Sequence, residues 1–184
     1  MVNHNRVHFM IKDIVHIKNF LIEEERLLFI EESKNYQWKL SGGSGVMAKE
    51  NDNFVFWCKN MNNTHHWINF FKDKIMSLVN LNLQHNKFYL NGQTYGQCGS
   101  FHRDIAEDVQ GDYLTAVYFP GIYEYSPVMG GHIMIQEGDK LHSILPYTNS
   151  IVIFNSKNLH VGLEPTRFCK EMRTSLAAKY KVLT

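Results

Sequence analysis

The spacing of apolar positions changes near residue 84. Before it, the acidic run Glu23–Glu25 precedes the apolar run Leu27–Ile30, an order that favours a helix because acidic side chains stabilise its first turn. A second helix is expected to begin near Asn63 or Thr64, either of which can cap it. Its apolar residues recur every three or four positions: Trp67, Phe70, Phe71, Ile75, Leu78 and Val79. The first 84 residues are therefore predicted to be mainly helical, with a Gly- and Ser-rich loop over Ser41–Asn53.

Short strand-like segments replace the helical spacing after Gln84. They are rich in Val, Ile, Tyr and Phe, and turn residues separate them: Lys87–Leu90, Ser100–Asp104, Tyr113–Phe119, His132–Gln136, Lys140–Ile144, Ile151–Phe154 and Thr174–Lys181. Many strands at short spacing, with no helices between them, are typical of a sandwich or barrel. We therefore predict one α+β, mainly β, domain over residues 1–184. A helical support over 1–84 would brace a cupin-like jelly-roll core over 85–184.

Composition narrows the class of protein. Of the 184 residues, 44% are hydrophobic and 20% are charged, which suits a globular domain and argues against a disordered chain. The formal net charge of +1 argues against a nucleic-acid partner, since phosphate binding calls for an excess of Lys and Arg. No apolar run reaches the roughly 20 residues of a membrane span, and the first residues do not resemble an export signal. Three widely spaced cysteines without a CxxC pair predict reduced thiols and a cytoplasmic location.

Two histidines and a carboxylate are the first candidates for chemistry. In His102-Arg103-Asp104, the first and third residues would point to the same face of a strand, where both could contact one metal ion. His160 follows the apolar run Ile151–Phe154 and a polar turn, at the start of a late strand or in the loop before it. Two histidines and one carboxylate leave one side of a metal open, an arrangement diagnostic of non-haem Fe(II) oxygenases. Zinc is the chemical alternative for these ligands.

A guanidinium and a hydroxyl follow on the last predicted strand. Arg173 and Ser175 lie two residues apart, so they share one face of that strand. A buried guanidinium needs a partner, and its planar fork suits both oxygens of a carboxylate. The strand would therefore hold a carboxylate near the metal, unless Arg173 is a surface residue.

In this order, the residues resemble the Fe(II)/2-oxoglutarate-dependent dioxygenases, specifically the prolyl 4-hydroxylase-like branch. The segment Tyr89–Tyr95 is similar to the Tyr-x-x-Gly-Gln-x-Tyr sequence that precedes the metal site in that family. Further landmarks follow in the order of the family: His102-x-Asp104, Tyr113–Phe119, Gly130-Gly131, Pro146, Ile151–Phe154, His160 and Arg173-Thr174-Ser175-Leu176. The resemblance covers roughly residues 85 to 182.

The resemblance implies a double-stranded β-helix with N-terminal helices against its larger sheet. It implies Fe(II) held by His102, Asp104 and His160, with 2-oxoglutarate and O₂ as cosubstrates and ascorbate as an optional reductant. No catalytic residue beyond the metal site is implied.

The same resemblance implies how 2-oxoglutarate is held. Its distal carboxylate would lie on Arg173, with Ser175 matching the serine of an Arg-x-Ser variant and Tyr89 matching a tyrosine that lines the pocket. Because many prolyl 4-hydroxylases use lysine for this carboxylate, Lys170 is an alternative to Arg173.

The activity implied by the resemblance is hydroxylation of an unactivated C–H bond, while 2-oxoglutarate is converted to succinate and CO₂. A prolyl residue in a peptide or protein is the first choice of substrate. The alternatives are a hydroxylase of free amino acids or small molecules, an AlkB-like nucleic-acid demethylase, and a non-catalytic metal-binding jelly-roll module. Tyr123 and Tyr125 could stack on a proline ring or pack their loop against the barrel. Their segment, Gly121–Met129, and the Ser41–Asn53 loop are candidates for covering the active-site mouth; no oligomeric state is indicated.

Overall fold

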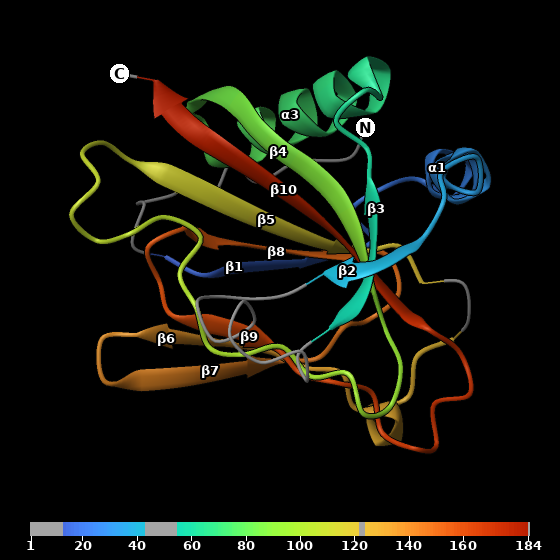
Figure 1. Cartoon of the computed structure of the whole chain (residues 1–184). Helices are drawn as coiled ribbons and strands as arrows, with labels where there is room; N and C mark the ends of the chain where they lie inside the picture. The colour runs from blue at the N-terminus through green and yellow to red at the C-terminus, as the bar shows by residue number, and fades with distance from the viewer. Residues whose placement is uncertain (1–12, 43–54, 122–123, 184) are drawn as a thin grey trace.

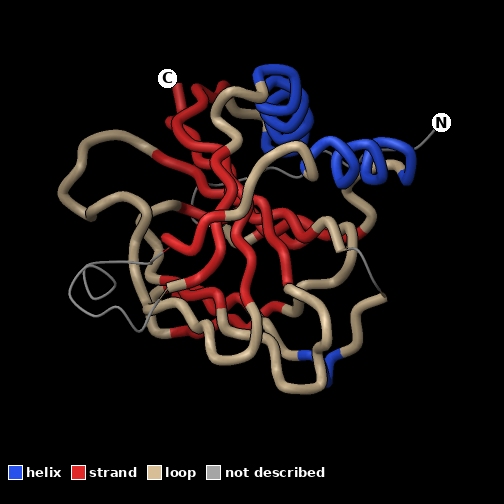
Figure 2. The backbone as a smooth tube through the Cα atoms, turned by 45° about the vertical axis from the view of Figure 1, so that its right-hand side comes forward, coloured by secondary structure: helices blue, strands red, loops and turns tan. Residues whose placement is uncertain are grey.

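Two antiparallel sheets face each other in the structure, a computed structural model that describes residues 13–42, 55–121 and 124–183. Figure 1 shows helices α1 (Glu23–Ser33) and α3 (His65–Val79) on one side of the larger sheet, and the smaller sheet on the other. In the turned view the helices again lie together along one side of the strands (Figure 2). The mainly β fold expected from the sequence is confirmed.

The two sheets differ in size, and the chain passes between them only in its second half. Among the described residues, the larger sheet has seven strands in the order β1-β8-β5-β10-β4-β3-β2, and the smaller has three in the order β7-β6-β9. Their bounds are β1 Val15–Lys18, β2 Lys39–Gly42, β3 Phe56–Asn60, β4 Asn82–Gln93, β5 Tyr113–Phe119, β6 Ile133–Glu137, β7 Lys140–Ile144, β8 Ser150–Asn155, β9 His160–Gly162 and β10 Arg173–Leu183. A short 3₁₀ turn, η2 (Pro127–Met129), precedes β6. From β5 onward the chain crosses repeatedly from one sheet to the other, which is jelly-roll topology.

Both predicted helices are present and cover one face of the larger sheet. The backbone N–H of Ile22 donates to Glu25 Oε2 at 3.2 Å and so begins α1. Asn80 takes a left-handed conformation, with φ 55°, and ends α3. The faces of the helices meet the sheet through a cluster of edge-on and tilted aromatic rings: Phe29, Trp67, Phe71, Phe88 and Tyr118.

A second, smaller core packs in part of the space between the sheets. It consists of Val117, Phe119, Ile133, Ile135, Val152 and Phe154. On β10, Leu176, Ala178 and Tyr180 belong to the core beneath the helices. Because side chains alternate along a strand, Arg173, Ser175 and Lys179 project to the opposite face, into the space between the sheets. This space is called the chamber below.

Two sequence-based expectations are wrong. The first 84 residues are not only a helical support, because β1, β2 and β3 extend both edges of the larger sheet. The segment Ser100–Asp104 is not a strand: it makes one isolated bridge, between His102 and His160, and then turns so that the N–H groups of Asp104 and Ile105 donate to Ser156 O. The backbone groups of this segment thus form hydrogen bonds to residues 156 and 160, and not the regular ladder of a strand.

One further expectation falls mostly outside the residues that the structure describes, and another can be checked only within them. The Ser41–Asn53 loop lies outside the described residues apart from its first two positions, as does Tyr123. Within the part of the chain that the structure describes, no helix has the length and apolar character needed to cross a membrane.

Candidate metal centre and chamber

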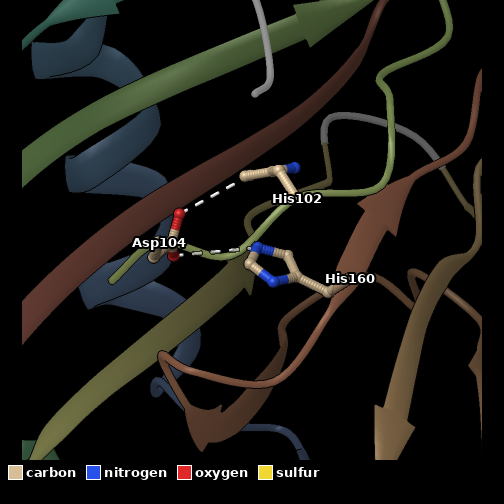
Figure 3. Close-up of side chains that lie close together, drawn as sticks. All are labelled: His102, Asp104 and His160. Atoms are coloured by element: carbon tan, nitrogen blue, oxygen red, sulfur yellow. Dashed lines mark ion pairs between the residues drawn. The ribbon is translucent and has the colours of Figure 1, made fainter. Parts of the chain in front are cut away.

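His102, Asp104 and His160 meet at one point although the second and third lie 56 positions apart in the sequence. The backbone N–H groups of His102 and His160 each donate to the carbonyl oxygen of the other at 2.9 Å, which places the two imidazoles side by side. Their ring centroids lie 4.3 Å apart. His102 Nε2 lies 3.5 Å from Asp104 Oδ1, and His160 Nε2 lies 3.7 Å from Asp104 Oδ2 (Figure 3).

Both imidazoles are oriented for metal binding by the backbone. His102 Nδ1 contacts Ser100 O and His160 Nδ1 contacts Asn158 O, each at 2.9 Å. A carbonyl oxygen can only accept, so Nδ1 carries the hydrogen in both rings and the Nε2 lone pairs face the carboxylate. Three electron-pair donors therefore converge with no proton between them in the neutral imidazole form. A divalent cation is the partner that fits this donor set, and the carbonyl contacts are those that orient histidine ligands in metal sites.

Burial controls the charge of the centre. The pKa of His160 is lowered to about 4, chiefly because burial penalises the imidazolium, so this ligand is neutral at neutral pH. Its contact with Asp104 is then between a lone pair and a carboxylate, and not an ion pair. Burial alone would raise the pKa of Asp104, but the ammonium of Lys179, which donates to this carboxylate, outweighs burial and holds that pKa far below its usual range.

The Asp104 carboxylate is held by two further side chains. Thr115 Oγ1 donates to Oδ2 at 2.7 Å, and Lys179 Nζ donates to Oδ1 at 2.5 Å. The carboxylate side chain is only 2% exposed. Burial would lower the pKa of Lys179, but Tyr89 and Asp104 beside it outweigh that effect and raise it. The carboxylate is therefore fixed and ionised before any ion binds.

Arg173 occupies another part of the same chamber. It is 5% exposed, and its Nη1 donates to Gln93 Oε1 at 2.6 Å and, more weakly, to Ser175 Oγ at 3.4 Å. Its Nε donates to Gly131 O at 3.1 Å, and the guanidinium lies 5.2 Å from the centroid of the Phe119 ring. These contacts hold the planar fork in one orientation.

Gly131 is required for this arrangement. Its φ of 75° lies in the left-handed region that favours glycine, and a Cβ there would stand 3.3 Å from Arg173 Cγ. The Gly130-Gly131 pair noted in the sequence thus lets the backbone approach the guanidinium closely enough to accept its hydrogen bond.

The chamber connects Arg173 with the metal centre. Arg173 pairs with Gln93, and Ser175 with Asn91, across β10 and β4. Gln93 Nε2 donates to Gly162 O at 3.1 Å, two residues after His160 on β9. The strand that carries a metal ligand is therefore tied to the residue that orients the guanidinium.

The other sequence candidates are placed as follows. Lys170 is exposed, in the loop before β10, whereas Arg173 lies inside the chamber. Tyr89 is half-buried on β4, its ring centroid 5.3 Å from Lys179 Nζ. Tyr125 donates to Gly130 O at 2.9 Å and shares a small hollow with Phe119 and Arg173 rather than with the triad.

Sequence reasoning missed three residues that touch these sites: Gln93, Thr115 and Lys179. A signal for Lys179 was available, because it follows Arg173 and Ser175 at even spacing on the same strand and so shares their face. Gln93 lies within the Tyr89–Tyr95 segment but had no assigned role. Nothing in the sequence distinguishes Thr115 from an ordinary strand residue.

The sequence matches no protein-family model and no curated protein. Solved structures do match. An oxidoreductase of the 2OG-Fe(II) oxygenase family from Burkholderia pseudomallei aligns with a TM-score of 0.72 at 10% identity, over 91% of this chain and 84% of that one. The non-haem alpha-ketoglutarate-dependent epimerase SnoN from nogalamycin biosynthesis aligns with a TM-score of 0.67 at 14% identity, over 91% and 76%.

A prolyl hydroxylase from Trichoplax adhaerens, in complex with a peptide fragment of the oxygen degradation domain of hypoxia inducible factor, aligns with a TM-score of 0.62. Its identity is 17%, over 92% of this chain and 83% of that one. The fold is therefore the double-stranded β-helix of the Fe(II)/2-oxoglutarate oxygenases, as the resemblance in the sequence implied.

Proposed function

We propose that this protein is an Fe(II)- and 2-oxoglutarate-dependent oxygenase. One observation carries the proposal: three convergent ligand atoms and a buried, oriented guanidinium face the same chamber, tied together through β9 and Gln93. Such a chamber suits a small dicarboxylate that reaches the metal at one end and a cation at the other. The double-stranded β-helix shared with oxygenases of this class supports it.

We assign separate binding roles to the residues of the chamber. His102, Asp104 and His160 would hold the ferrous ion, and Arg173 with Ser175 would bind the distal carboxylate of 2-oxoglutarate. Tyr89 would line the same pocket. When bound, iron and 2-oxoglutarate together supply the activation of O₂ that an unactivated C–H bond requires. The buried walls of the chamber keep water from the reacting groups.

For the substrate we propose a prolyl residue in a peptide or protein. The support is the Tyr-x-x-Gly-Gln-x-Tyr pattern of Tyr89–Tyr95 together with the structural likeness to a prolyl hydroxylase in complex with a peptide. Hydroxylation would consume O₂ and release succinate and CO₂. We include a cytoplasmic location in the proposal, because three widely spaced cysteines without a CxxC pair favour reduced thiols.

A coupled assay tests the activity. The protein would be incubated with Fe(II), 2-oxoglutarate and ascorbate, and with proline-containing peptides or free amino acids, while succinate and a mass gain of one oxygen atom are measured. We expect both products with a peptide and neither with the H102A variant. Absence of succinate and of 2-oxoglutarate binding would instead indicate a non-catalytic metal-binding jelly roll. Succinate with a modified free amino acid, and no modified peptide, would overturn the substrate alone.

A further inference from the structure

A cradle of two paired residues holds the carboxylate of Asp104. Lys179 of β10 and Thr115 of β5 are direct partners in the antiparallel ladder, so their side chains leave the sheet together on the chamber face. Each engages a different oxygen: Lys179 Nζ donates to Oδ1 and Thr115 Oγ1 donates to Oδ2. Thr115 Oγ1 also lies 2.8 Å from Ser156 Oγ, which anchors that side of the cradle.

The lysine supplies the positive charge that a metal would otherwise supply. Asp104 is 2% exposed and Lys179 is 12% exposed, so water screens neither charge well. In the tautomer that the backbone carbonyl contacts favour, with the hydrogen on Nδ1, His102 and His160 present Nε2 lone pairs to the carboxylate, and a lone pair cannot compensate its charge. The ammonium is therefore the group that stabilises the buried carboxylate when the centre holds no ion.

A divalent cation bound by the triad would meet this ammonium at close range. His102 Nε2 lies 3.5 Å from the same Asp104 oxygen that Lys179 holds at 2.5 Å. An ion shared by His102 and that oxygen would lie within a few ångströms of Nζ, where like charges repel strongly in a buried site. Binding the ion and keeping the lysine contact are thus in competition.

We propose that Lys179 is a positioning residue that sets the metal affinity of the centre by competing with the ion for Asp104. In the ion-free protein it holds the carboxylate in place through the contact with Oδ1. On loading, its contact with Asp104 weakens, so the triad binds a divalent ion less tightly than the same ligands would without the lysine. This inference rests on the proposed function only in taking the triad as the metal site.

Titration with Mn(II) alone, without 2-oxoglutarate, tests the inference. Free Mn(II) would be followed by electron paramagnetic resonance for the wild type and the K179M and K179Q variants. We expect both variants to bind Mn(II) at least tenfold more tightly, since each removes the competing charge. The matched control is K181M, the same substitution on the same strand at an exposed position, and its affinity should stay within about twofold of the wild type.

Two further variants separate charge from packing. K179R keeps a cation at the position and should bind Mn(II) as weakly as the wild type. A merely structural role for Lys179 would make K179M and K179Q bind more weakly or equally, and either result would overturn the inference. Should K179M not fold without metal, the comparison of K179Q with K179R carries the test.

The melting temperature gives a second readout of the same competition. Without metal, K179Q leaves a buried carboxylate with no cation and should melt below the wild type, and excess Mn(II) should raise its melting temperature by more than it raises that of the wild type. Equal shifts would contradict the inference. Failure of the wild type and every variant to bind Mn(II) would instead remove the metal site itself, and with it the proposed function.

Discussion

Gln93 and Arg173 face each other across β4 and β10 and are joined by a 2.6 Å hydrogen bond from Nη1 to Oε1. The amide of Gln93 continues the connection, because its Nε2 donates to Gln97 O at 2.9 Å and to Gly162 O at 3.1 Å. One side chain thus ties the guanidinium to the loop after β4 and to the strand that begins with His160. The orientation of Arg173 is set by the same framework that sets one metal ligand.

Replacing Gln93 should weaken 2-oxoglutarate binding without changing the chemistry. In Q93L the guanidinium loses its shortest oriented contact, and a hydrogen bond to a charged group contributes about 1.5–3 kcal/mol. We expect the KM for 2-oxoglutarate to rise at least about tenfold with kcat little changed, because the lost contact orients a binding group. Steady-state kinetics at varied 2-oxoglutarate check this. Q84L, on an exposed position of the same strand, is the control, and a large fall in kcat at unchanged KM would refute the assignment.

Removing Asp104 should destabilise the metal-free protein more than removing His102. D104A leaves the ammonium of Lys179 buried without its carboxylate, and breaking a buried ion pair in this way costs about 3–5 kcal/mol. H102A removes a ligand but leaves no unpaired charge, and its backbone bridge to His160 remains. We expect urea unfolding, with a chelator present to remove metal, to show that H102A lowers the free energy of unfolding by about 1 kcal/mol or less.

The control for this comparison is D112A, which removes an exposed carboxylate. Both D104A and H102A should abolish turnover. Equal stability of D104A and H102A would show that the Asp104–Lys179 contact contributes little to the folded state.

The metal-free protein should lose stability as the pH falls from about 6.5 to 4. Burial lowers the pKa of His160 to about 4, while in the unfolded chain the group keeps its ordinary pKa of 6.5. Between these values the unfolded state binds the proton and the folded state does not, so acid favours unfolding, by up to about 3 kcal/mol. Above pH 6.5 this contribution is fully present and constant.

Urea unfolding at pH 7.5, 6 and 5 measures this contribution. The H160F variant lacks the titrating group and should show a shallower decline over the same interval. H65F, on the exposed first turn of α3, should decline as the wild type does. An H160F slope equal to that of the wild type would mean that His160 is not held neutral by burial.

The sequence was sufficient for the parts of the fold that periodicity encodes. Strand-forming residues bounded by turn residues predicted β5 (Tyr113–Phe119) and β7 (Lys140–Ile144) with the bounds that the structure has. The edge strand β1 escaped notice because its four residues are too short for alternation to stand out. The local pattern predicts a strand over Ser100–Asp104, whereas the backbone groups of this segment pair across the chain with residues 156 and 160.

The candidate site, like the fold, could be predicted from the sequence only in part. The order of His102, Asp104, His160 and Arg173 along the chain was enough to expect them together, and the structure brings the first three within reach of one ion. The roles of Thr115 and Lys179 could not be assigned from sequence, since they depend on the register of β5 against β10 and on where the loop after His102 turns. A lysine on a strand is ordinarily solvated, and only the structure shows that the side chain of Lys179 is 12% exposed.

Calorimetric titration of 2-oxoglutarate into the protein, with Mn(II) in place of iron, tests the central claim most directly: one diacid spans the metal centre and Arg173. We expect binding to the wild type with Mn(II) present, and at least about a hundredfold loss of affinity, near 2.7 kcal/mol, in R173M and again in H102A. K170M should bind as the wild type does, because Lys170 is exposed outside the chamber. Binding that survives R173M but is lost in K170M, or that does not depend on the metal ligands, would contradict the account.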